Sequence, residues 1–74
     1  MADRNRPDAR EMLLDVLLEK VSEDRFPSNS MLDLIEQLLR HDEVAVYVRI
    51  LLRKVSGERF PSLPMLRRIA SLCE

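Results

Sequence analysis

Two residues in this chain are of types that commonly serve as nucleophile and general base: the single cysteine, Cys73, and the single histidine, His41. A cysteine–histidine pair works only when the two side chains lie within hydrogen-bonding distance. The two are 32 residues apart, and Cys73 falls on the apolar side of the last predicted helix. We therefore expect no enzyme activity, and we interpret His41 as a cation near the carboxyl end of a helix, where it favours the helix dipole.

Metal and cofactor sites are not predicted either. A structural zinc site needs several ligands at hairpin spacing, and this sequence has no such cluster. The only glycine, Gly57, cannot form a glycine-rich phosphate loop. The carboxylates fall at helical positions that we expect to be exposed and solvated. We predict no catalytic residue, metal, cofactor or small-molecule ligand.

Composition limits the remaining function classes. The chain has 74 residues, of which 46% are hydrophobic and 34% charged, with a net charge of −1. This length predicts one domain over residues 1–74, with residues 1–6 flexible. The first ten residues are polar and resemble no signal peptide, and no apolar run approaches the length of a membrane span. We expect a cytoplasmic protein without membrane contact.

The strongest pattern is an internal repeat with a period of 34 residues. Residues 12–40 align with residues 46–74 without a gap, and 13 of the 29 pairs are identical. The identities include the turn sequence Arg-Phe-Pro-Ser, at residues 25–28 and again at 59–62. Such a repeat indicates a duplicated unit.

Each repeat is predicted to be a helical hairpin. The hairpins cover residues 7–40 and 42–74, and the fold class is all-α with four helices and an approximate internal two-fold axis. The first helix is expected to start near Pro7, because proline suits a first helical turn, and to end near residue 22. Ser28 and Ser62 are predicted N-caps, of helices ending near residues 40 and 72. Asp42 is predicted to cap the third helix, with Gly57 in a left-handed conformation after its end near residue 56.

One segment conflicts with this fold. Residues 44–50 are rich in β-branched side chains and would suit a strand. Their repeat partners at 12–16 have a helical pattern, so we predict a helix here as well. The first and third helices have apolar arcs much wider than those of the second and fourth. This difference predicts that the first and third are central and the other two pack outside them.

The Arg-Phe-Pro-Ser turns are the most specific motif. Our structural interpretation is that the phenylalanine closes the open end of the hairpin core. Proline then stops one helix, serine caps the next, and arginine meets the carbonyl end of the first. The functional alternative makes the two turns twin recognition loops.

Charge is exchanged between the two repeats. Asp15, Glu19 and Asp33 correspond to arginines in the second copy, and residues 1–40 carry a net charge of −3 against +2 for residues 41–74. These faces are either solvated or matched electrostatically, within the chain or with another chain. Leu34, whose partner is Arg68, is a further candidate contact. The candidate interaction surface is therefore Asp15, Glu19, Asp33, Leu34, Arg49, Arg53, Arg67 and Arg68.

Two functions fit these features. The first is a protein–protein interaction module that associates with itself, most simply as a homodimer, because 31 of the residues from 12 to 73 are apolar. The alternative is a nucleic-acid-binding transcriptional regulator that uses the basic second hairpin. The acidic net charge of the whole chain disfavours nucleic acid as the partner.

Overall fold

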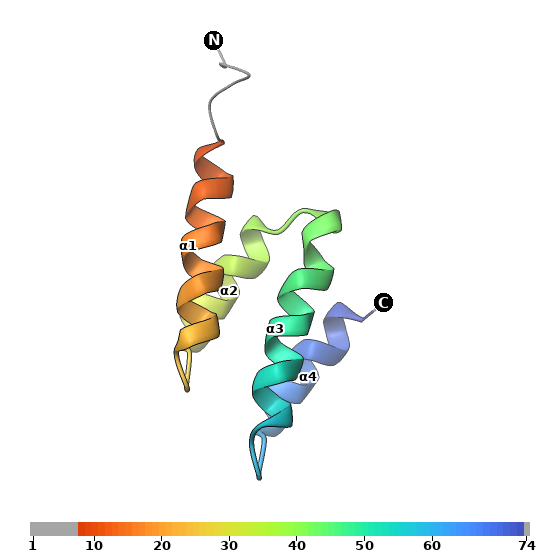
Figure 1. The fold of residues 1–74 in the computed structure, drawn as a ribbon. Helices are drawn as coiled ribbons and strands as arrows, with labels where there is room; N and C mark the ends of the chain where they lie inside the picture. The colour runs from red at the N-terminus through yellow and green to blue at the C-terminus, as the bar shows by residue number, and fades with distance from the viewer. Residues whose placement is uncertain (1–7, 74) are drawn as a thin grey trace. The chain divides into compact units, whose positions relative to one another are not determined.

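Every regular element in the structure, a computed structural model that describes residues 8–73, is a helix (Figure 1). The elements are α1 (Ala9–Glu23), α2 (Asn29–Leu38), the short 3-10 helix η1 (His41–Glu43), α3 (Val44–Ser56) and α4 (Leu63–Leu72). The all-α prediction is confirmed for these residues. The β-branched segment 44–50 is helical because this places Tyr47 and Leu51, four residues apart, on one buried face.

The chain divides between Leu39 and Arg40 into two compact units. In the first hairpin α1 packs against α2, and in the second hairpin α3 packs against α4 (Figure 1). Each pair of helices is joined by a short turn that contains the Arg-Phe-Pro-Ser sequence. The single domain over 1–74 and the predicted hairpin limits stay predictions, and residues 1–6 and Pro7 lie outside the described residues.

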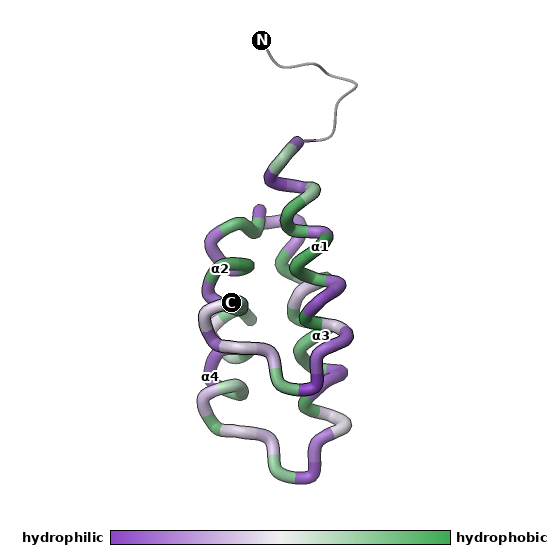
Figure 2. The backbone as a smooth tube through the Cα atoms, turned by 90° about the vertical axis from the view of Figure 1, so that its left-hand side faces the viewer, coloured by the Kyte–Doolittle hydropathy of each residue, from purple (hydrophilic) through white to green (hydrophobic). Residues whose placement is uncertain are grey.

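Each hairpin has a small aliphatic core. In the first hairpin the buried side chains are Leu14, Val21, Leu32 and Ile35; in the second they are Tyr47, Leu51 and Ile69. Hydrophobic and hydrophilic residues accordingly alternate along each helix (Figure 2), which is the pattern of amphipathic helices.

The two hairpins bury different repeat positions. Tyr47 is fully buried, whereas Leu13, its partner in the alignment, is exposed. Leu14 is buried, whereas its partner Val48 is only half-buried. A tyrosine has more surface to bury than a leucine, so its presence at position 47 favours a different buried face.

The repeated serines cap the second helix of each hairpin, as predicted. The Oγ of Ser28 accepts a hydrogen bond from the backbone N–H of Met31 at 3.1 Å, and the Oγ of Ser62 accepts one from Met65 at 3.2 Å. Pro64 lies in the first turn of α4, where its missing N–H has no helical partner to lose.

The starts of α1 and α3 differ from the predictions. The N-cap of α1 is Asp8, whose Oδ1 accepts a hydrogen bond from the backbone N–H of Arg10 at 3.0 Å. The predicted cap Asp42 does not cap α3, because it lies inside η1. The helical conformation begins earlier than predicted, since Glu43 accepts a hydrogen bond from the backbone N–H of Arg40 at 2.8 Å.

The left-handed conformation expected at Gly57 is also wrong. Gly57 has φ −85° and ψ −7°, in the right-handed helical region. The chain leaves α3 through a tightened last turn, in which Gly57 and Glu58 donate to the carbonyls of Lys54 and Val55. A right-handed exit of this kind does not require glycine.

Removing either serine cap should destabilise its hairpin. We expect Ser28→Ala and Ser62→Ala each to lower the free energy of unfolding by about 1 kcal/mol, because an N–H of the first turn loses its acceptor. Urea titration followed by circular dichroism measures this change. Ser30→Ala, at an exposed site one residue into α2, is the matched control and should have no such effect. A loss at Ser30 equal to that at Ser28 would contradict the capping role.

Candidate interaction surface

The phenylalanines of the repeated turns are the most exposed large apolar side chains in the described part of the chain. Phe26 is 78% exposed and Phe60 is 85% exposed. The prediction that they close the hairpin core is therefore wrong. The capping serine lies two residues beyond the ring, so α2 or α4 starts three residues beyond it, and the ring stays outside the buried core of its hairpin.

The arginine of each turn lies against the neighbouring ring. The guanidinium carbon of Arg25 is 5.7 Å from the centroid of Phe26, and the corresponding distance from Arg59 to Phe60 is 6.0 Å. A cation above an aromatic face is weakly attracted by the ring quadrupole. In Figure 2 hydrophilic and hydrophobic residues adjoin along the backbone at the tip of each hairpin. Each tip is thus a small aromatic projection beside an arginine, which an acidic residue, Asp24 or Glu58, precedes in the chain.

The predicted charged residues lie on the helix surfaces of their own hairpins. Asp15 and Glu19 are exposed on α1, four residues apart and therefore on one face. Arg49 and Arg53 are exposed on α3 with the same spacing. Of the remaining candidates, Asp33 and Leu34 are exposed on α2, and on α4 Arg67 is exposed while Arg68 is half-buried.

Exposed apolar side chains flank both charged rows. At 100° per residue, Met12 and Val16 follow directly around α1 from Glu19, and their exposed fractions are 56% and 54%. Val46 and Ile50 take the same place beside Arg53 on α3, with Val46 52% exposed and Ile50 half-buried. The two helices therefore present faces of similar layout and opposite charge.

The open end of the first hairpin, opposite its turn, is closed by Arg10. The Nη1 of Arg10 donates a hydrogen bond to the carbonyl oxygen of Leu38, the last residue of α2, at 2.6 Å. That carbonyl has no partner within its own helix. Asp8 holds the same arginine from the other side, with 4.0 Å between its Oδ2 and Nε. The arginine side chain thereby ties the start of α1 to the end of α2.

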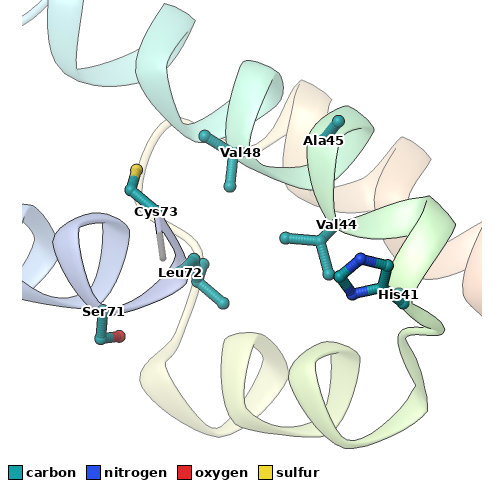
Figure 3. Close-up of a pocket in the computed structure, with 7 residues that line it drawn as sticks. All are labelled: His41, Val44, Ala45, Val48, Ser71, Leu72 and Cys73. Atoms are coloured by element: carbon teal, nitrogen blue, oxygen red, sulfur yellow. The ribbon is translucent and has the colours of Figure 1, made fainter.

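The open end of the second hairpin contains a hollow instead. The residue that corresponds to Arg10 is Val44, whose side chain is too short to reach across. The hollow has a volume of about 600 Å³ and lies between the start of α3 and the end of α4 (Figure 3). We call it the α3–α4 hollow; its lining residues are His41, Val44, Ala45, Val48, Ser71, Leu72 and Cys73.

His41 and Cys73 line the same hollow although they are far apart in sequence. Figure 3 shows the imidazole and the thiol at opposite ends of it, with Val44 and Val48 between them. This arrangement does not place the two groups as a nucleophile and its base.

Within residues 8–73 no group of three or more potential metal ligands occurs, and no helix is long and apolar enough to cross a membrane.

Truncating Arg10 should destabilise the first hairpin. We expect Arg10→Ala to lower the free energy of unfolding by about 1.5 kcal/mol, because a carbonyl at the end of α2 loses a charged hydrogen-bond donor. Arg49→Ala, which removes an exposed arginine, should change it by less than about 0.5 kcal/mol. Urea denaturation of both variants makes the comparison. Equal changes would mean that Arg10 does not close the hairpin.

The comparisons with known proteins identify no family. No family model, no curated protein and no solved structure matches this chain.

Proposed function

We propose that this chain is a protein–protein interaction module without catalytic chemistry, and that it associates with a second copy of itself as a homodimer. The observation that carries the proposal is the pair of similar helix faces with opposite charge, on α1 and on α3. Each face combines two exposed like charges with apolar side chains that have no role in the buried core of their hairpin.

A duplicated hairpin with an approximate internal two-fold relation underlies this proposal. The support for it is the 13 identities in 29 aligned pairs, together with serine caps at equivalent positions. The bounds of α4, Leu63–Leu72, also lie 34 residues beyond those of α2, Asn29–Leu38. Duplication of one unit gives two surfaces of the same shape, and later charge exchange makes one complementary to the other.

An antiparallel approach of α1 to α3 of a second copy satisfies both charged rows. In this orientation Glu19 meets Arg49 when Asp15 meets Arg53, because both pairs are spaced by four residues. The apolar flanks lie on matching sides, so Val16 comes close to Ile50, while Met12 and Val46 lie towards opposite ends of the contact. Chains related by a two-fold axis form this contact twice, which closes the assembly at two copies.

The apolar flanks supply most of the affinity in this arrangement. Exposed ion pairs typically contribute about 0–1 kcal/mol each, whereas burial of one aliphatic side chain contributes about 1.5–3 kcal/mol. The charges set the orientation instead, because a parallel approach would place each charged row against the apolar flank of the other helix, and the pairing of two α1 helices would bring like charges together. A weak, salt-sensitive dimer follows from this balance.

Reversal of the basic row should weaken association. We expect the wild-type chain to form dimers whose affinity falls with added salt, and Arg49→Glu with Arg53→Glu to raise the dimer dissociation constant by about tenfold or more. Sedimentation equilibrium at low and high salt measures both effects.

A compensating variant provides the control. Adding Asp15→Arg and Glu19→Arg to the reversed pair exchanges the two rows and should restore the dimer. A wild-type chain that stays monomeric at several hundred micromolar would overturn self-association. A shift of random duplex DNA at low salt would favour the nucleic-acid-binding alternative, since non-specific phosphate binding is strongest there.

A further inference from the structure

We propose that the start of α4 and the turn before it bind the surface of an anionic lipid bilayer. The residues concerned are Arg59, Phe60, Leu63, Leu66 and Arg67, which we call the α4 entry patch. The proposal goes beyond self-association, because none of these residues belongs to the α1 and α3 faces that form the homodimer.

The α4 entry patch combines exposed apolar groups with two cations. Phe60 is 85% exposed, Leu63 56% and Leu66 39%. At 100° per residue, Leu66, Leu63 and Arg67 follow one another around α4 within an arc of about 100°, so one face of the helix carries all three. Phe60 lies three residues before Leu63, and the guanidinium carbon of Arg59 is 6.0 Å from its ring centroid.

The equivalent positions of the first hairpin lack this combination. Asn29 and the fully buried Leu32 occupy the positions of the two leucines, and Asp33 occupies that of the second arginine. The five positions carry two arginines in the second hairpin, for a net charge of +2, but one arginine and one aspartate in the first, for a net charge of 0. The patch is therefore a property of the second hairpin and not of the repeated turn.

The surrounding segment strengthens this contrast. Residues 53–67 contain four basic residues and one acidic residue, so their net charge is +3. The aligned residues 19–33 contain two basic and four acidic residues, for a net charge of −2. The end of the second hairpin that contains the turn is thus positive in a chain whose net charge is −1, and it suits an anionic partner.

An anionic bilayer matches both parts of the patch. Lipid phosphates attract guanidinium groups, and the boundary between headgroups and acyl chains accepts aromatic and aliphatic side chains. Phe60 and Leu63 lie in a turn and in the first turn of a helix, outside the buried core, so they can enter this boundary while the hairpin stays folded.

The leucines distinguish a bilayer from a nucleic acid. An exposed phenylalanine beside arginines could also stack on an unpaired base while the arginines contact phosphates. Leu63 and Leu66 would gain little from such a partner, because aliphatic side chains are stabilised by burial in an apolar medium. The composition of the patch therefore favours lipid.

This contact differs from the expectation of no membrane contact. That expectation rested on the absence of a long apolar run, whereas the patch residues are separated in the sequence by serine, proline and methionine. Binding of a few side chains at a surface needs no such run. Each basic residue near an anionic surface strengthens binding by about fivefold, so the association is weak, reversible and dependent on anionic lipid.

A tryptophan reporter tests the assignment, because the chain contains no tryptophan. Phe60→Trp, with Phe26→Trp as its matched control, is mixed with phosphatidylcholine vesicles that contain about one-quarter phosphatidylglycerol. We expect the emission of Phe60→Trp to shift to shorter wavelengths and to be quenched by brominated lipid, whereas the emission of Phe26→Trp stays unchanged. Vesicles of phosphatidylcholine alone should bind at least about tenfold more weakly. Equal responses at the two positions would overturn the proposal.

Substitutions copied from the first hairpin provide a second test. In the Phe60→Trp chain, Leu63→Asn and Arg67→Asp should each lower the vesicle partition coefficient at least about tenfold. Asparagine and aspartate occupy the same two positions of α2, so α4 should remain folded, which circular dichroism checks. Variants that bind vesicles as tightly as their parent would show that the patch is not the lipid contact.

Two further measurements separate this proposal from the others. Sedimentation equilibrium without lipid should give Leu63→Asn the dimer dissociation constant of the wild type, so loss of vesicle binding and loss of the homodimer are distinguishable. A fluorescence change of Phe60→Trp with single-stranded DNA at low salt, and none with vesicles, would assign the patch to nucleic acid instead. No change with either probe would also refute the lipid contact.

Discussion

The structure depends on the packing of one short helix against one longer helix. A helix of ten residues, such as α2 or α4, is not stable alone in water, because nucleation is unfavourable and few hydrogen bonds follow it. Leu32 and Ile35 are fully buried in the first hairpin and provide the stabilisation that the isolated helix lacks. The capping serines and the Arg10 bridge then act at the two ends of a hairpin that this burial already holds together.

Helix content and the serine caps could be predicted from the sequence because they rest on local chemistry. Both the apolar periodicity and a serine three residues before a backbone N–H that lacks a helical partner can be recognised in a single sequence. The exposure of Phe26 and Phe60 could not be, since hydropathy predicts burial of every phenylalanine and only the geometry of the turn decides otherwise. The first residues of α1 and α3 could not be predicted from the sequence for a similar reason. Asp8 and Asp42 occupy equivalent positions in the repeat, but only Asp8 caps a helix.

The candidate surface was predictable in part. The charge exchange between Asp15 and Arg49 can be read from the alignment, but the hollow cannot, because it depends on how the start of α3 and the end of α4 pack. An arginine at the equivalent place in the first hairpin bridges two helices, whereas a valine leaves space between them. Under the proposed self-association, differences between the copies, rather than the features they share, make the two surfaces complementary.

The repeated turn holds its phenylalanine in position before any encounter takes place. Proline restricts the backbone immediately after the ring, and the serine that follows is committed to a cap. If such a turn takes part in an interface, its backbone has less conformational entropy to lose on association, so more of the interaction energy remains as affinity. The turn thus presents an exposed aromatic ring on a restricted backbone.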